Sequence, residues 1–154
     1  MILHLLQFVS LLLVALGMGL SFSHALQWTP KAKLPGNIFL IIQKNLYLNY
    51  GPAAAILEIG SSVSCLAILA LLPQGTIAFL FTLIGFIFLS LMFIVWAAFI
   101  QPINRQVSTW KEDSLPSNWA QYGRGRWHTL HLIRLALAII ALGALIASVL
   151  IERP

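Results

Sequence analysis

Four long apolar stretches alternate with polar segments along this chain, at residues 2–26, 52–72, 76–100 and 127–151. An α-helix needs about 20 apolar residues to cross the hydrocarbon core of a bilayer. The stretches do not alternate between apolar and polar residues over about ten positions, as barrel strands do. Because backbone groups in lipid must be hydrogen-bonded within the spanning structure, each stretch is predicted to be a transmembrane helix.

The connections between the stretches differ in length. The second and third stretches are joined by Pro73-Gln74-Gly75, a tight turn, whereas the other two connections each run to about 25 residues, more than a simple link requires. After Pro35-Gly36, apolar residues recur at helical spacing, which predicts a short interfacial helix capped by Asn37 and ending near Tyr50. The predicted fold is all-α, an integral membrane four-helix bundle in which residues 1–154 form a single transmembrane domain.

Composition and charge agree with a membrane protein. Hydrophobic residues make up 60% of the chain and charged residues 8%, whereas soluble domains carry roughly 25% charged residues. Only Arg153 lies on one side of the predicted bundle, and the opposite side carries Lys31, Lys33, Lys44, Arg105, Lys111, Arg124 and Arg126. Because short loops rich in Lys and Arg stay cytoplasmic, both termini are predicted to lie outside the cytoplasm, in a bacterial inner membrane. These cations are scattered along membrane-edge loops, which favours anionic lipid over nucleic acid as their partner.

The first stretch could be a cleaved signal peptide, and the single cysteine restricts the possible disulfide and haem-attachment sites. Ser23-His24-Ala25 has the small-x-small pattern of a signal-peptide cleavage site, but the apolar run is too long and no Lys or Arg precedes it. We therefore expect a retained helix. Cys65 is the only cysteine, which excludes an intramolecular disulfide and a c-type haem attachment motif, and it is expected to be a small buried residue.

Polar residues within the apolar stretches lie near the ends that share one side of the membrane. Glu58 and Arg134 lie roughly 9–10 Å below the same surface, and His24 and His131 roughly 5–6 Å below it, at 1.5 Å per residue. His128 shares a helix face with His131. Ionisable groups that face lipid are costly, so these side chains are predicted to point into the bundle.

Each of these residues also has a structural interpretation. Glu58 and Arg134 are equally consistent with an ion pair that only joins two helices. His24 and His131 are equally consistent with hydrogen bonds between helices, whereas for His128 an anchor at the headgroup level is the favoured interpretation. The tryptophans, Trp96 and Trp127 among them, match the aromatic belt of a membrane interface.

Three chemistries are compatible with these side chains. His24, Glu58, His128 and His131 are ligand types for iron, copper or zinc, although Arg134 beside them would repel a cation. A b-type haem could be held between His24 and His131. In the third interpretation, a histidine is the general base that acts on a lipophilic, phenol-like carbon acid, and Arg134 stabilises the anion without any cofactor.

Scattered positions along nearly the whole chain resemble a known family. They are Gly19-Leu20-Ser21-Phe22-Ser23-His24-Ala25-Leu26 with Pro30 and Lys31, Gln101-Pro102-Ile103-Asn104 with Trp110, and Arg126-Trp127 with His131 and Arg134. This pattern resembles the small four-helix membrane family that includes the fungal anthrone oxygenases. The resemblance implies a four-helix membrane bundle and, for the characterised branch, a cofactor-independent oxidation of anthrones to anthraquinones. Asn104, Trp110, Trp127 and Arg134 match the family pattern, whereas His131 stands where many relatives have Asn.

The sequence therefore predicts a polar site that binds or oxidises a lipophilic aromatic or quinone-like molecule. Candidate catalytic residues are His24, Glu58, His131 and Arg134, and candidate ligand-binding residues are Trp96, Asn104, Trp127 and His128. No metal and no cofactor is assigned, because Arg134 lies one turn from His131 and nothing else marks a porphyrin site. The alternatives are a non-catalytic small membrane subunit or scaffold with a partner in a larger complex, and a haem- or metal-binding membrane protein.

Overall fold

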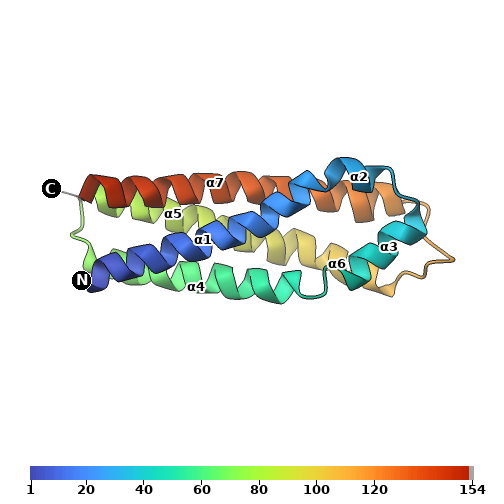
Figure 1. The fold of residues 1–154 in the computed structure, drawn as a ribbon, viewed down its shortest axis with the longest axis horizontal. Coiled ribbons are helices and arrows are strands. Elements are labelled where there is room, and N and C mark those ends of the chain that lie inside the picture. Colours follow the sequence, from blue (N-terminus) through green and yellow to red (C-terminus); the bar gives the residue numbers. More distant parts are fainter. Residues whose placement is uncertain (153–154) are drawn as a thin grey trace.

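The computed structural model describes residues 1–152, and four of its helical segments are long and apolar enough to cross a membrane. The bundle contains α1 (Ile2–Leu26), α4 (Tyr50–Leu71), α5 (Ile77–Val95) and α7 (Trp127–Glu152). In Figure 1 the start of α1 and the end of α7 lie at one end of the bundle, and the short helices α2 (Trp28–Ala32), α3 (Gly36–Asn45) and α6 (Gln101–Thr109) lie at the other. The predicted all-α membrane bundle is thus confirmed.

The tight turn between α4 and α5 requires a glycine. Gly75 has a φ of 83°, a conformation that side chains with a Cβ rarely adopt. Thr76 then caps α5, because its hydroxyl accepts a hydrogen bond from the backbone N–H of Phe79 at 3.2 Å. This short link makes α4 and α5 antiparallel neighbours.

Small and polar residues let the helices approach each other inside the bundle. A Cβ on Gly85 of α5 would lie 2.8 Å from the side chain of Leu145 on α7, so the glycine allows close packing there. The hydroxyls of Thr82 and Ser148 are 2.8 Å apart and join the same two helices. Cys65 is fully buried, as expected, and its sulfur lies 3.3 Å from the hydroxyl of Ser10.

Large apolar side chains cover the outside of the bundle and are exposed in the absence of lipid. They include Ile56, Ile59 and Val63 on α4 and Ile139 and Ile140 on α7. An exposed apolar surface of this extent indicates contact with the hydrocarbon core of a bilayer. The protein is therefore integral to a membrane.

The second long connection is more helical than predicted. α5 continues through a π-helical turn, η1 (Trp96–Ile100), into α6, and another π-helical segment, η2 (Ala120–Arg126), leads into α7. Pro102 cannot donate a backbone hydrogen bond and its ring crowds the preceding turn, but the wider turn of η1 lets the helix pass it. The expectation of a polar connection over residues 101–126 is corrected to a connection of about ten residues between two helices.

The interfacial helix is shorter than predicted. α3 begins at Gly36 after Pro35 and ends at Asn45, and no side chain caps it, so the prediction that Asn37 caps a helix reaching Tyr50 is wrong. Tyr50 instead begins α4, two residues before the predicted start of that span.

Two cations hold the α2–α3 segment against the chain that precedes α7. Lys44 on α3 donates a hydrogen bond to the carbonyl of Trp110 at 2.6 Å. Arg124 donates to the carbonyl of Leu34 at 3.1 Å. The short helices are thus fixed over this end of the bundle.

Candidate functional site

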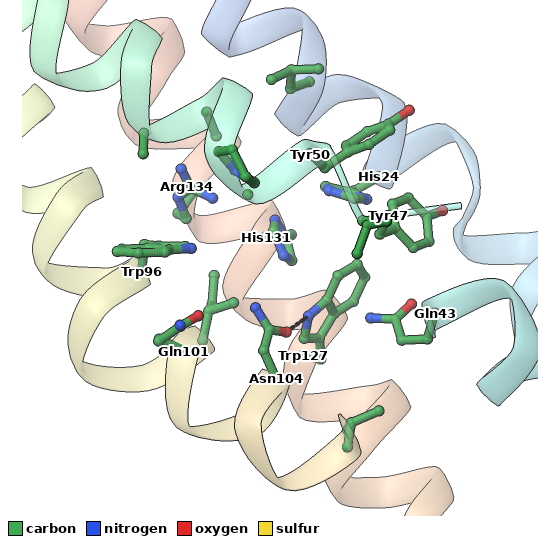
Figure 2. Close-up of a pocket in the computed structure, with 18 of the residues that line it drawn as sticks. His24, Gln43, Tyr47, Tyr50, Trp96, Gln101, Asn104, Trp127, His131 and Arg134 are labelled. Carbon is green, nitrogen blue, oxygen red and sulfur yellow. Dashed lines mark hydrogen bonds between the residues drawn. The ribbon is translucent and has the colours of Figure 1, made fainter. Parts of the chain in front are cut away.

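A cavity of about 570 Å³ lies between the bundle and the short helices at this end. It is within the range of 300–1,000 Å³ that is typical of small-molecule sites. The side chains labelled in Figure 2 line it: His24 from α1, Gln43 from α3, Tyr47 from the turn between α3 and α4, Tyr50 from the start of α4, Trp96, Gln101 and Asn104 from η1 and α6, and Trp127, His131 and Arg134 from α7.

The histidines of α1 and α7 meet at the inner wall of the cavity. The ring centroids of His24 and His131 are 4.1 Å apart, and each residue is 5% exposed. Trp127 contacts both rings, with centroid distances of 4.8 Å to His24 and 4.1 Å to His131. The Nδ1 atom of each histidine is buried without a hydrogen-bond partner. Both imidazoles therefore keep a ring nitrogen that is not committed to the protein.

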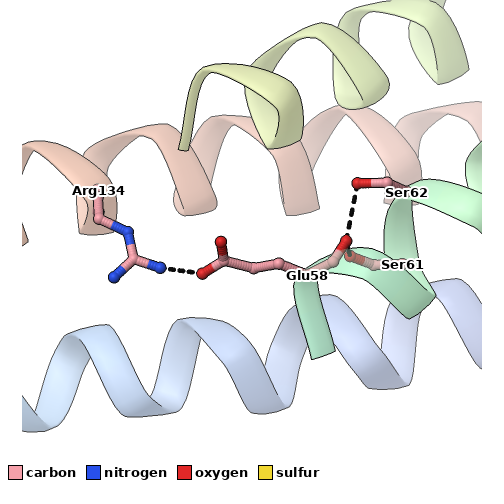
Figure 3. Close-up of polar contacts among 4 residues, drawn as sticks. All are labelled: Glu58, Ser61, Ser62 and Arg134. Atoms are coloured by element: carbon pink, nitrogen blue, oxygen red, sulfur yellow. Dashed lines mark hydrogen bonds and ion pairs between the residues drawn. The ribbon is translucent and has the colours of Figure 1, made fainter. Parts of the chain in front are cut away.

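The deeper wall contains an ion pair that joins α4 to α7. The guanidinium of Arg134 donates a hydrogen bond to the carboxylate of Glu58, as Figure 3 shows, and the two side chains are 4% and 7% exposed. The backbone carbonyl of Glu58 accepts hydrogen bonds from the hydroxyls of Ser61 at 3.0 Å and Ser62 at 2.7 Å. Matched depth correctly predicted this pair.

Arg134 and Glu58 are not equivalent with respect to the cavity. Arg134 lines it, whereas Glu58 is not among the lining residues. The Nε atom of Arg134 is buried without a hydrogen-bond partner. Glu58 thus balances the charge of a guanidinium that retains donor capacity.

The structure divides the predicted ligand-binding residues into two groups. Trp96, Asn104 and Trp127 line the cavity, and the indole N–H of Trp127 donates to the side-chain oxygen of Asn104 at 2.8 Å. His128 does not line it, because its ring stacks on Trp28 of α2 with centroids 4.1 Å apart. Positions three apart on a helix differ by about 60° around its axis, so His128 turns toward α2 while His131 faces the cavity.

Several lining residues were not found from the sequence. Gln43, Tyr47, Tyr50 and Gln101 all line the cavity. The Tyr47 hydroxyl donates to the side-chain oxygen of Gln27, and burial together with the nearby Tyr50 raises the pKa of Tyr47 to about 12. Tyr47 is therefore a neutral phenol at physiological pH. Tyr50 was recognised as part of an apolar stripe, but no sequence pattern indicated that Tyr47 would line a cavity.

The positions of these residues also test whether they could hold a haem or a metal ion. A haem with two axial imidazoles needs its iron and porphyrin plane between the rings, and the 4.1 Å between the centroids of His24 and His131 leaves no room for them. The proposed metal ligands do not come together, since Glu58 pairs with Arg134 and His128 turns away. Among the described side chains of residues 1–151, no group of three or more His, Cys, Asp or Glu is arranged to hold a metal ion.

Comparison with known families adds independent information. The sequence model of the family described as Anthrone oxygenase matches residues 47–144, which is more than half of the chain. The matched region contains the ion pair, His131 and most of the cavity wall. No curated protein and no solved structure matches the chain.

Proposed function

The chain belongs to the anthrone oxygenase family, and from this premise we propose that the cavity binds a flat lipophilic aromatic molecule and promotes its oxidation by O₂. The observation that supports the proposal best is the meeting of three features at one cavity: aromatic walls, an uncommitted histidine pair and a buried guanidinium. Each feature corresponds to one requirement of the reaction, namely binding, proton removal and stabilisation of an anion.

The walls of the cavity suit a planar ring system. Tyr50, Trp96 and Trp127 contribute aromatic surfaces, and the volume of about 570 Å³ accommodates a fused tricyclic molecule. Gln43, Gln101 and Asn104 add amide groups that can hydrogen-bond to oxygen substituents. The proposed substrate is an anthrone-like carbon acid, with a CH₂ group flanked by aromatic rings and a carbonyl across the central ring.

The proposed reaction begins with proton removal. A histidine, which we assign as His131, takes a proton from the CH₂ group, and the electron pair of the broken C–H bond moves into the ring system to give an enolate. His131 is the better candidate because Arg134, one turn along α7, can donate hydrogen bonds to the enolate oxygen. His24 holds the ring of His131 in place through their contact.

Oxygen then completes the reaction. The enolate is oxidised by O₂, which adds to the former CH₂ carbon and takes up a proton to give a hydroperoxide. Loss of water from the hydroperoxide leaves a carbonyl, so that the net change is CH₂ + O₂ → C=O + H₂O. Imidazole titrates near neutral pH in water, which makes it a suitable group to accept and return the proton.

The proposed route of the substrate into the cavity is from the bilayer, between α4 and η1. Among the lining residues, His24, His131 and Arg134 are buried, whereas Ala54 and Ala55 of α4 and Trp96 of η1 are half-buried. The small side chains of Ala54 and Ala55 would obstruct such a path little. A lipophilic substrate that partitions into the membrane would reach the histidines along this route.

The function is tested by oxygen uptake with the protein purified in detergent and supplied with anthrone. We expect anthraquinone absorbance to rise with consumption of one O₂ per anthrone, and His131→Ala to reduce the rate at least 100-fold, since positioned acid–base groups contribute about 10²–10⁴-fold. His4→Ala is the matched control, because His4 is exposed at the opposite end of the bundle. Equal rates in the His131→Ala and His4→Ala variants would disprove the assigned base.

We also propose that this end of the bundle faces the cytoplasm of a bacterial cell. The observation in support is that Lys31, Lys111 and Arg124 all lie in or beside the short helices there. A Lys111→Cys variant in intact cells tests it, because Cys65 is fully buried and gives little background. We expect no labelling by a membrane-impermeant thiol reagent, and labelling would reverse the proposed orientation.

A further inference from the structure

Lys31 on α2 is a buried cation beside the cavity. The residue is 7% exposed, and its ammonium nitrogen has no hydrogen-bond partner. The nitrogen lies 3.9 Å from the ring centroid of Tyr47 and 5.3 Å from that of Trp127. Arg124 approaches the backbone carbonyl of Lys31 at 3.5 Å and bonds that of Leu34 at 3.1 Å, which fixes this segment in position.

The protein does not balance this charge. Among the side chains that the structure describes, those of residues 1–151, the pair of Glu58 with Arg134 is the only ion pair, and no carboxylate approaches Lys31. Contacts with aromatic faces recover only part of the hydration free energy that an ammonium loses when it leaves water. Burial lowers the pKa of Lys31 to about 8, so the amine is still mostly protonated at neutral pH. An anionic ligand would supply the countercharge that this buried cation lacks.

The charge lies directly beside the proposed binding site. Lys31 does not itself line the cavity, but Tyr47 and Trp127 do, and its ammonium rests against both rings. A ring packed on Tyr47 from the cavity would lie about 3.5–4 Å farther on, which places a charge on that ligand roughly 8 Å from the nitrogen. At that distance in a poorly solvated site, two unit charges still interact appreciably.

We propose that Lys31 is a positioning residue whose charge, acting past Tyr47 and Trp127, makes the cavity select aromatic ligands that carry an ionised hydroxyl or enol group. This inference rests on the proposed function, because it concerns the same cavity. The other titratable or charged groups that face a ligand there are His24, His131, Lys44, Tyr47, Tyr50 and Arg134. The Lys44 nitrogen already bonds the Trp110 carbonyl and Arg134 is paired with Glu58, which leaves Lys31 as the cation without a partner.

The test compares two ligands that differ in charge. Alizarin is a hydroxyanthraquinone whose visible absorption moves to longer wavelength when it ionises, and anthraquinone has the same ring system without an ionisable group. We expect Lys31→Met to weaken the binding of ionised alizarin at least about tenfold, as Coulomb's law gives at roughly 8 Å, and to leave anthraquinone affinity unchanged. Lys31→Arg should restore alizarin affinity, because it restores the charge.

Lys33→Met is the matched control, since Lys33 belongs to the same segment but is exposed. The spectrum of bound alizarin gives a second measurement that packing alone would not change: the ionised form should predominate in the native protein and decrease in Lys31→Met. Anthraquinone affinity reports whether each variant is folded, and Lys31→Gln provides a second uncharged side chain.

The outcomes separate this inference from the proposed function. Equal losses of alizarin and anthraquinone affinity in both Lys31→Met and Lys31→Gln would assign Lys31 a packing role and overturn the inference. So would equal effects of Lys31→Met and Lys33→Met on alizarin. If both ligands bind the native protein and Lys31→Met changes neither affinity, the inference fails but the proposed binding site stands. If neither ligand binds, both proposals fail.

Discussion

Replacing Glu58 by Gln tests how much the buried ion pair stabilises the bundle. The substitution keeps the size of the side chain and one oxygen that accepts a hydrogen bond from Arg134, but it removes the negative charge. Both side chains are less than a tenth exposed, so water cannot solvate the guanidinium that is left behind. Breaking a buried pair by removing one partner costs about 3–5 kcal/mol. Because Gln can still accept one hydrogen bond, we expect a loss near 3 kcal/mol in the free energy of unfolding.

The free energy of unfolding can be measured by titrating denaturing detergent into micelles of the purified protein and following helix content. Glu112→Gln is the matched control, because Glu112 is exposed in the connection between α6 and η2 and should change stability by less than about 0.5 kcal/mol. The double variant Glu58→Gln, Arg134→Met should recover much of the loss, since the unbalanced charge is gone. A Glu58→Gln variant as stable as Glu112→Gln would refute the reasoning, because Arg134 would then be solvated in the folded protein.

Three further results are expected from the site. Ala55→Phe should narrow the proposed route between α4 and η1 and raise KM for anthrone at least about tenfold, with kcat little changed, as steady-state oxygen uptake would reveal. Asn104→Ala should cost about 1 kcal/mol of stability and raise KM, because Trp127 loses its hydrogen bond; unchanged kinetics would contradict a positioning role. Burial lowers the pKa of Lys31 from its usual 10.5 to about 8, so the unfolded chain binds more protons between these values and stability should rise with pH from about 8 to 10. Lys31→Met should lack this rise, and above pH 10 the raised pKa of Tyr47 should act in the opposite direction.

The spans and the paired polar residues could be predicted from the sequence because lipid leaves few options. A long apolar run must be helical, and the fixed rise of a helix converts sequence position into depth. The predicted depth of His24 matched that of His131, and the predicted depth of Glu58 matched that of Arg134. The structure places the first two rings 4.1 Å apart and joins the other two side chains in an ion pair.

Depth does not determine how a helix is rotated or where a polar helix ends. His128 was grouped with His131 because they are three residues apart, but the rotation of α7 turns His128 toward Trp28. The extension of α5 into α6 was missed because its outward residues are polar. Ile100, Ile103, Val107 and Trp110 are buried there at intervals of three and four residues, a pattern that the sequence already contained.

The residues that define the cavity mouth depended on tertiary packing. Tyr47 lies in the turn between α3 and α4, and Lys31 lies on a five-residue helix that has no strong sequence signal of its own. Their positions depend on the hydrogen bonds of Lys44 and Arg124, which hold α2 and α3 in place and join segments more than 60 residues apart. Such contacts cannot be read from local patterns.

The two buried cations of the site differ in a way that bears on their roles. Arg134 has a carboxylate partner, so its charge is balanced in the folded protein and it contributes to both stability and the cavity wall. The Lys31 ammonium has aromatic contacts but no carboxylate partner, so its charge is expected to destabilise the fold, and the proposed anionic ligand would compensate it. Replacing Lys31 by Met should therefore leave the protein at least as stable while weakening anion binding, whereas replacing Glu58 should destabilise it. A destabilising charge such as that of Lys31 is expected to be retained where it contributes to the binding of a ligand.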